Sequence, residues 1–304
     1  MPTPRKNPHR DEWPGTYYVQ AKRKKEKKEE IERIELEGRL SDATMQGPLV
    51  EQPDPAIFHQ VLDVACGTGG WVIETALAYP HMRLIGIDIN RSLVEVACAQ
   101  AEAQQLTDRV SFQVMDALAP LEFPKESFDL VNMRIAGSFL RTWEWPGLLL
   151  ELLRILRPGG VVRVTEPEMA WDTSSQALIR CTKQTTRALY RAGHYYEDDY
   201  RGITTHLPRL LSNHGWKNVQ KKIYTRLYRA GTPEVQEYYE NLAHLRAFLP
   251  FLEKWGCYPD GFENVYHQAL KEIQQSDFYA VQNLVTVWGV KPCPTSSPEC
   301  KNGL

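Results

Sequence analysis

The sequence predicts an α/β protein with a doubly wound, mostly parallel sheet covered by helices on both faces. Two observations lead to this fold class. From Phe58 onward, short apolar runs alternate with helical segments, which is the pattern of successive βαβ units. A Gly-rich turn, Cys66–Gly70, joins the first apolar run to the helix behind it. In such a sheet the ligand site lies at the carboxyl ends of the strands, so the residues that end each run are candidates for function.

The bulk properties exclude several classes. The chain has 304 residues and a formal net charge of −2, which gives no general attraction to nucleic acid or anionic membranes. It has no long apolar run and no apolar N-terminal signal, so we expect a cytoplasmic protein without a membrane span. The cysteines lack metal-ligand spacing, which favours reduced thiols and no bound metal; they are Cys66, Cys98, Cys181, Cys257, Cys293 and Cys300.

Residues 1–55 are expected to form an N-terminal helical extension. Residues 21–40 are charged and helical, and the following residues 41–57 resemble a linker. The run KRKKEKK could contact nucleic acid, but the interleaved glutamates favour a solvated helix face. Tyr17 and Tyr18 stand in a polar segment. They could fold over a ligand as a lid, or simply dock on the body.

The core elements follow at regular intervals. Strands are expected at 61–64, 83–87, 110–115, 128–132 and 161–165. Helices are expected at 71–78 and at 92–105, where Ser92 is a plausible N-cap. Another helix follows the fourth strand, with Pro146 in its first turn and Gly159 past its end.

The second half is less regular. We expect helices at 176–192 and 207–214, a strand at 218–228, a helical stretch rich in aromatic residues at 233–275, and a last strand at 278–288. The tail 293–304 has a composition typical of disorder.

The glycine turn is the first candidate site. Glycines between a strand and a helix let the backbone approach a ligand and expose N–H groups near the helix N-terminus. A dinucleotide site prefers G-x-G-x-x-G, and its third glycine would fall on Val72. This mismatch argues against a nicotinamide-dependent oxidoreductase. Alone, the turn is equally consistent with a tight strand-to-helix connection.

Two carboxylates at the next strand ends favour a ligand site over a simple strand-to-helix connection. Asp88 ends the second strand, where a carboxylate can accept hydrogen bonds from both ribose hydroxyls. Asp116 ends the third strand, where it could meet an adenine amino group. Either residue alone could be a cap or a turn residue. Together with the glycine turn they point to a nucleoside-containing ligand.

These motifs give the chain a resemblance to a known family. VLDVACGTGG, IGIDIN, VMDA, FDLVNMR and LLRILRPGGVVRVTEPE resemble the successive motifs of the class I S-adenosylmethionine-dependent methyltransferases, of the small-molecule type. The resemblance covers about 58–168. It implies S-adenosyl-L-methionine as cofactor and S-adenosyl-L-homocysteine as product.

The resemblance also implies a Rossmann-like sheet of seven strands, the last one antiparallel. Residues 218–228 and 278–288 would be strands six and seven, with a helical cap inserted between them. The expected units are an extension or lid at 1–55, the cofactor-binding core at 56–230, the cap at 231–277, the last core strand at 278–292 and the tail at 293–304.

The family pattern assigns roles around the glycine turn. Gly67 and Gly69 would pass under the methionine part of the cofactor. Asp63 would order the turn and help bind the amino group. Ala65 takes the place of a more frequent glycine. Trp71 would either touch the methionine chain or pack inside the helix layer.

It assigns others to the nucleoside and the sulfonium. Asp88 would bind the ribose while Ile89 packs against adenine, and Asp116 with Ala117 would frame the adenine edge. The end of the fourth strand would lie beside the sulfonium, through Asn132, Met133 and Arg134.

Such a cofactor is already activated, so the protein mainly positions the acceptor for in-line attack and excludes water. A general base is needed only if the acceptor must lose a proton. Candidates are Glu166 as a base, Arg134 as an orienting cation and His194. The alternatives are a loop-stabilising carboxylate, an ion pair and a surface aromatic cluster. Tyr195 and Tyr196, beside His194, are candidate substrate contacts.

The aromatic-rich cap favours a small, apolar or aromatic acceptor, with O-, N- and C-methylation all open. An RNA or protein methyltransferase is the first alternative, supported only by the basic N-terminal helix. A non-catalytic regulator that binds S-adenosylmethionine is the second. The expected partner is thus a small-molecule substrate rather than nucleic acid, with a homodimer possible.

Overall fold

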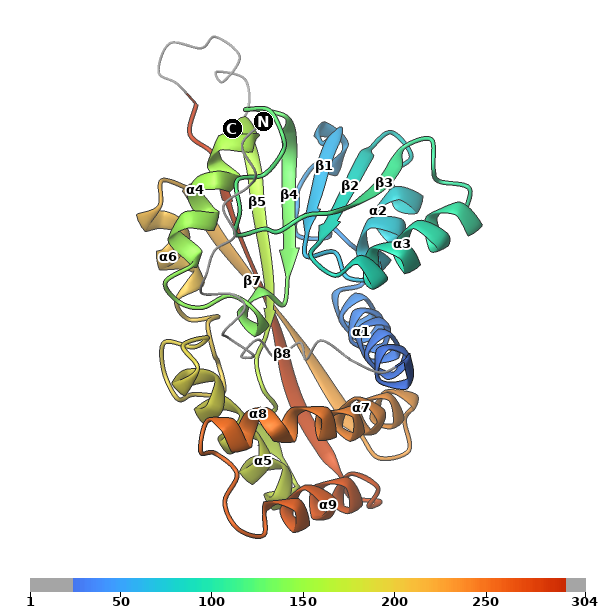
Figure 1. The fold of residues 1–304 in the computed structure, drawn as a ribbon, viewed down its shortest axis with the longest axis vertical. Helices are drawn as coiled ribbons and strands as arrows, with labels where there is room; N and C mark the ends of the chain where they lie inside the picture. The colour runs from blue at the N-terminus through green and yellow to red at the C-terminus, as the bar shows by residue number, and fades with distance from the viewer. Residues whose placement is uncertain (1–23, 294–304) are drawn as a thin grey trace.

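Figure 1 shows the computed structural model, which describes residues 24–293. In this part of the chain an eight-stranded sheet has the order β3-β2-β1-β4-β5-β8-β6, and β7 pairs with β8. The strands are β1 (Gln60–Val64), β2 (Arg83–Asp88), β3 (Val110–Val114), β4 (Phe128–Arg134), β5 (Leu156–Pro167), β6 (Asp172–Thr173), β7 (Lys217–Arg229) and β8 (Tyr279–Val290).

The helices of the described chain alternate with the strands and then gather between β7 and β8. They are α1 (Lys24–Met45), α2 (Gly70–Ala78), α3 (Arg91–Ala103), α4 (Trp145–Ile155), α5 (Gln176–Arg191), α6 (Leu207–Asn213), α7 (Pro233–His244), α8 (Leu249–Lys254) and α9 (Phe262–Ile273), with short 3-10 turns at Pro55–Ile57, Ala136–Ser138 and Leu245–Phe248.

The strand directions confirm the predicted sheet. Strands β1 to β5 are parallel to one another, and β8 runs antiparallel to both β5 and β7. The addition is β6, which pairs with β8 at Asp172 and Thr173. Because β7 occupies one edge of β8 along its whole length, β5 and β6 share the other edge. A two-residue strand carries no periodicity, so the sequence pattern could not predict it.

Helices cover both faces of the sheet because its strands are apolar on both sides. One face packs Leu62 and Val64 against α4 and α6, in a fully buried cluster. The other packs Val61 and Leu84 against α2, whose Trp71 is buried there. The doubly wound arrangement that the alternating pattern predicts is therefore confirmed.

Helix α3 begins at Arg91, one residue earlier than expected. The side chain of Asn90 accepts a hydrogen bond from the backbone N–H of Ser92 at 3.0 Å, so Asn90 is the N-cap and the prediction of Ser92 is wrong. Both residue types cap well, and only the backbone conformation decides between them.

Helix α1 is longer than expected. It continues to Met45, so the predicted linker at 41–57 is wrong for its first five residues. Ser41 and Thr44 donate their hydroxyls to the backbone carbonyls of Glu37 and Leu40, at 2.9 and 2.7 Å. These polar residues are thereby satisfied inside the helix, and their side chains compete less with helix formation.

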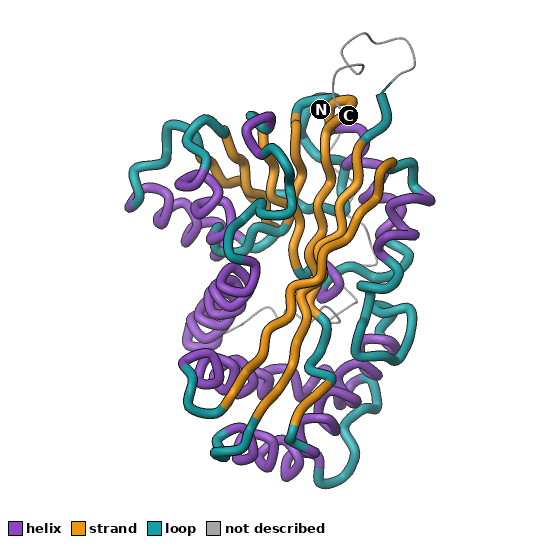
Figure 2. Tube along the Cα trace, turned by 180° about the vertical axis from the view of Figure 1, so that it is seen from behind, coloured by secondary structure: helices purple, strands orange, loops and turns teal. Residues whose placement is uncertain are grey.

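The region between β7 and β8 is helical, as predicted for the cap. Strands β7 and β8 extend beyond the parallel core and reach a layer formed by α5, α7, α8 and α9 (Figures 1 and 2). Buried Leu178, Leu252, Tyr266 and Phe278 form the centre of this layer. Helix α1 joins the same cluster through Leu36 and Leu40. The cap therefore shares one apolar core with α1, α5 and the ends of β7 and β8.

The cysteines follow the prediction with one exception. Cys66, Cys98, Cys181 and Cys257 are free thiols. Cys293 is disulfide-bonded, so the prediction of reduced thiols is wrong for it. Pairing depends on the distance between backbones, which residue spacing alone does not give. Within 24–293, no helix is long and apolar enough to cross a bilayer, and no three potential metal ligands converge.

The packing around Gly86 gives a stability prediction. A Cβ at this position in β2 would lie 2.5 Å from Phe112 Cδ1 and 2.9 Å from Cys66 Sγ. Gly86→Ala should therefore lower the free energy of unfolding by about 1–3 kcal/mol through overpacking. Urea denaturation measures this. Gly70→Ala is the control, since a Cβ there meets nothing within 4 Å. Equal midpoints for the two variants would contradict the prediction.

Candidate functional site

The glycine turn lies between β1 and α2 at the carboxyl edge of the sheet. Ala65, Gly67 and Gly69 have φ values of 58°, 57° and 78°, a conformation that a Cβ disfavours. Ala65 is the strained member, which fits its departure from the family pattern. Gly69 caps α2 without a side-chain hydrogen bond. The first N–H groups of the helix are therefore available to a ligand.

Helix α1 packs directly on this turn. A Cβ at Gly67 would lie 3.1 Å from Ile34 Cγ2. Gln100 of α3 donates to Glu35 of α1 at 2.8 Å. The N-terminal helix and the glycine turn thus form one surface. Tyr17 and Tyr18, predicted as lid residues, lie outside the described residues.

Asp88 ends β2 beside the turn, as predicted. Its two oxygens accept the backbone N–H groups of Gly67 at 3.0 Å and Asn90 at 2.8 Å. Burial raises the pKa of this carboxyl. Each oxygen keeps a further lone pair for a ligand hydroxyl. The next residue, Ile89, is an apolar side chain that is 58% exposed.

Asp116 follows β3 in the adjacent connection. Its side chain accepts the backbone N–H of Leu118 at 2.9 Å, which fits the turn role considered for it. Both Asp116 and Ala117 are half-buried. They lie at the same edge as Asp88, since β2 and β3 are parallel and Asp88 pairs with Val114.

Asp63 and Asn132 lie side by side inside the sheet. Asn132 Nδ2 donates to Asp63 Oδ1 at 2.7 Å. Asn132 is 0% exposed and Asp63 is 3% exposed. Burial raises the pKa of Asp63 to about 7, against the opposing effects of Arg134 and Asn132. The protonation state of Asp63 therefore depends on the charged and polar groups around it.

Met133 and Trp71 are core residues in this structure. Both are at most 1% exposed, and Trp71 Nε1 donates to the carbonyl of Pro48 at 3.2 Å. Of the two roles that the sequence leaves open for Trp71, packing in the helix layer is the one this geometry supports.

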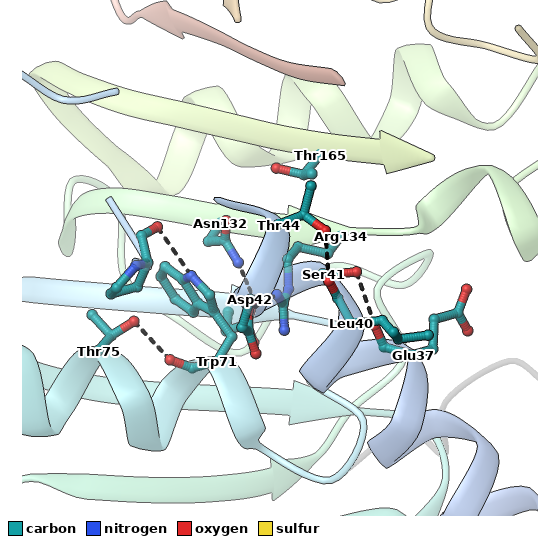
Figure 3. A network of polar contacts seen from close by, with 12 residues as sticks. Glu37, Leu40, Ser41, Asp42, Thr44, Trp71, Thr75, Asn132, Arg134 and Thr165 are labelled. Carbon is teal, nitrogen blue, oxygen red and sulfur yellow. Dashed lines mark hydrogen bonds and ion pairs between the residues drawn. The ribbon is translucent and has the colours of Figure 1, made fainter. Parts of the chain in front are cut away.

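Arg134 ends β4 and pairs with α1. Its Nη1 lies 2.5 Å from Asp42 Oδ1, and both side chains are largely buried (Figure 3). Glu74 of α2 joins them, and burial together with Asp42 raises its pKa. Asp42 and Glu74 gather with Arg134, and the charges of Arg134 and Asp42 also act on Asp63.

Glu166 is buried at the end of β5. Its carboxylate accepts the backbone N–H groups of Ala136 at 2.6 Å and Gly137 at 3.1 Å. Burial raises its pKa to about 8. These bonds anchor the turn after β4, which matches the loop-stabilising alternative considered for Glu166.

The cluster at 194–196 is packed against neighbouring loops. His194 is fully buried, with Nδ1 3.0 Å from the carbonyl of Leu140. Tyr195 is 9% exposed. The Tyr196 hydroxyl donates to the carbonyl of Thr142 at 3.2 Å, and its ring stacks on His206. The surface cluster considered for these residues is therefore wrong for His194 and Tyr195. The long-range packing that buries them is not visible in a loop-like sequence.

Sequence reasoning missed four charged residues at the site: Asp42, Glu51, Glu74 and Arg163. Arg163 had a signal, because it interrupts the apolar run of a strand that is buried on both faces. A charge there needs a partner. Its partner is Glu51, 2.7 Å away, and both side chains are 0% exposed.

A small pocket lies between α1 and the β7–β8 ribbon. Its walls combine apolar and polar groups: Glu37, Leu40, Ser41, Pro167, Arg226, Tyr228, Gln282 and Leu284. Tyr228 accepts from Arg226 Nη1 at 3.2 Å and donates to Gln282 at 2.9 Å. Pro167 ends β5, so the pocket adjoins the carboxyl edge of the sheet.

Comparison with known proteins agrees with this geometry. Residues 61–160 match the model of the methyltransferase domain family. Over this range the chain is therefore similar to methyltransferase domains. This match agrees with the family that the sequence motifs predict. The roles of the individual site residues stay predictions.

Related sequences match part of the chain. The methyltransferase GfsG of Streptomyces halstedii is 30% identical over 158 residues, 50% of this chain and 54% of GfsG. A demethylmenaquinone methyltransferase of Symbiobacterium thermophilum is 36% identical over 101 residues, 33% of this chain and 39% of that protein. The chain thus spans about half or less of these relatives.

Solved structures are similar to this fold over a larger share of the chain than the related sequences are. The [4+2]-cyclase SpnF has a TM-score of 0.52 at 20% identity, covering 84% of this chain and 81% of SpnF. A putative methyltransferase of Bacillus halodurans C-125 has a TM-score of 0.52 at 16% identity, covering 81% of this chain and 97% of that one. At such identities the likeness concerns the fold.

Asp88 offers a direct test of the site. Asp88→Ala should remove two charge-assisted hydrogen bonds to a ribose, each worth about 1.5–3 kcal/mol, and weaken S-adenosylhomocysteine binding at least about 100-fold. Isothermal titration measures the affinity. Asp108→Ala, at an exposed carboxylate, is the control. Unchanged affinity in the Asp88 variant would mean that the ribose is held elsewhere.

Glu166 gives a pH-dependent stability. Its folded pKa of about 8 lies above the ordinary value of 4.5, so the folded state keeps a proton that the unfolded state releases. The stability that this proton contributes is therefore lost as the pH rises from 4.5 to about 8. Glu166→Gln should flatten this decline in chemical denaturation series. Exposed Glu102→Gln should leave the decline as in the wild type. A decline as steep in Glu166→Gln would contradict the prediction.

Proposed function

We propose that this chain transfers a methyl group from S-adenosylmethionine to a small-molecule acceptor. The observation that carries the proposal is the row of polar groups at adjacent parallel strand ends, Asp63, Asp88 and Asp116, beside the glycine turn of a methyltransferase domain. When bound, the cofactor supplies a methyl group on a sulfonium. The chain then has to hold, orient and shield the two reactants.

The residues present fit this cofactor. The left-handed glycine turn brings backbone N–H groups to the ligand edge, and Asp88 has accepting capacity left for a ribose. Exposed Ile89 offers an apolar surface for adenine. Asp116 and Ala117 would line the adenine edge. Asp63 would bind the amino group of the methionine part.

The charges near the end of β4 suit a cation. Asp42, Glu74 and Asp63 gather around one arginine, Arg134. A carboxylate-rich, partly buried region attracts a cationic donor more strongly than exposed charges would. Arg134 pairs with Asp42 and would act by holding α1 over the site. We therefore assign Arg134 to positioning.

The pocket between α1 and the β7–β8 ribbon is our proposed acceptor site. Leu40, Pro167 and Leu284 give it apolar walls, and Arg226 with Tyr228 gives it a polar end. This combination is typical of small-molecule sites. The names of the relatives, a demethylmenaquinone methyltransferase among them, also support a small acceptor.

In this proposal catalysis rests on in-line positioning. Glu166 and His194 are both buried, and they form hydrogen bonds with backbone groups of neighbouring loops. We assign them to the support of the site. Helix α1, which lines the pocket, would act as a lid, since it contacts both the glycine turn and the cap.

The test is a methyl-transfer screen of the full chain with S-adenosylmethionine and a library of phenols, amines, isoprenoids and carboxylic acids. We expect S-adenosylhomocysteine to form with at least one small acceptor, whose mass rises by one methyl group. The Asp88→Ala variant should form none. Product formation would also exclude a non-catalytic regulator.

Two outcomes would contradict the proposal. Binding of a nicotinamide dinucleotide without binding of S-adenosylmethionine would move the chain to another class. Methylation confined to RNA or protein, with no small acceptor modified, would favour the macromolecular alternative.

A further inference from the structure

A row of buried polar side chains crosses the sheet behind the glycine turn. Asp63 of β1, Asn132 of β4 and Arg163 of β5 are direct neighbours in the strand register. Residues that pair in adjacent parallel strands point to the same face of the sheet. The three side chains therefore form one continuous line.

The contacts along this row have a fixed direction. Arg163 Nη1 donates to Asn132 Oδ1 at 2.6 Å, and Asn132 Nδ2 donates to Asp63 Oδ1 at 2.7 Å. A guanidinium has no acceptor, so the amide oxygen of Asn132 must face Arg163. The amide nitrogen is thereby directed at Asp63.

Glu51 fixes the far end of the row. Its Oε1 accepts Arg163 Nε at 2.7 Å, and its Oε2 lies 3.4 Å from Arg163 Nη2. The Tyr224 hydroxyl donates to the same Oε2 at 3.1 Å. Burial opposes the charge of Glu51, but the charge of Arg163 prevails and lowers the pKa of Glu51. Both partners are therefore held as ions.

A buried ion pair adds little to the stability of a core, because removing two charges from water costs free energy. Replacing a buried ion pair by apolar residues of similar volume is often neutral or stabilising. The Glu51–Arg163 pair has 0% side-chain exposure, so it makes no direct contact with solvent. Its contact toward the cofactor edge runs through Asn132 to Asp63, three residues before the glycine turn begins at Cys66.

We propose that Glu51 and Arg163 are positioning residues that act through Asn132 to hold Asp63 as an oriented carboxylate for the ammonium group of the methyl donor. This inference rests on the proposed function, which gives Asp63 that ligand. The hydrogen bond from Asn132 favours the charged form of Asp63, and Arg163 fixes and polarises the amide that makes it. With the row in place, burial and Asp42 raise the pKa of Asp63 to about 7, while Arg134, Asn132 and Arg163 oppose them. Without the row the pKa would be higher still, and a neutral carboxyl attracts an ammonium group weakly.

The test removes both charges together. In Glu51→Leu/Arg163→Met the ion pair is replaced by apolar side chains, which avoids an unpaired buried charge. S-adenosylhomocysteine affinity is measured by titration calorimetry across a pH series. We expect a loss of about tenfold below neutral pH, the effect of one pKa unit on Asp63, and a return toward wild-type affinity in alkaline buffer.

Two further variants separate positioning from general structure. Asn132→Leu cuts the row but keeps the Glu51–Arg163 pair, and it should show the same pH-dependent loss even if the double variant does not fold. Glu151→Leu/Arg154→Met removes another Glu–Arg pair, on α4, and should leave the affinity and its pH dependence unchanged.

The outcomes are distinct. A loss that is equal at every pH, or no loss in a folded Asn132→Leu, would overturn the positioning role while wild-type binding upholds the proposed function. Absence of S-adenosylhomocysteine binding by the wild-type chain would instead overturn the proposed function itself, and this inference with it.

Discussion

The long strand β8 is the element on which both halves of the molecule depend. It pairs with β5 over Leu284–Val290 in the core and with β7 over Tyr279–Val290. Its far end, at Ala280, belongs to the apolar cluster of the cap. The hydrogen-bond ladder therefore continues from the parallel core into the cap. A cap placed by a continuous ladder has little freedom to hinge, so the site must gain its adaptability elsewhere.

Helix α1 is the second link, and it is made of side-chain contacts alone. Ile34 lies on Gly67, Leu40 enters the cap cluster, and Asp42 pairs with Arg134. Any ligand that touches the glycine turn therefore shares that surface with α1. Side-chain contacts open more easily than a strand ladder, because no row of backbone hydrogen bonds has to break. Movement that admits a ligand is thus expected at α1, with the sheet fixed.

The sequence predicts the core and its strand ends because both depend on local patterns. Asp88 and Asp116 are recognisable since each follows an apolar run, and parallel pairing brings such ends to one edge. Asp42 and Glu51 were not predictable, as their partners Arg134 and Arg163 are 92 and 112 residues away in the chain. The packing role of Trp71 depends on the position of Pro48, which no periodicity encodes. Local sequence patterns therefore do not predict long-range polar contacts of this kind.

The same fold occurs in SpnF, which is named a cyclase, so the sheet alone does not decide the reaction. In the proposed reaction the sulfonium charge disappears as the methyl group leaves. An unpaired carboxylate beside it would stabilise the bound donor more than the transition state and slow the transfer. The pairing of Asp42 with Arg134 reduces that excess, while Asp63, held behind the turn, remains for a group whose charge does not change. In the proposed reaction the charges of the site would thus bind the donor by its ammonium end and leave the reacting end nearly balanced.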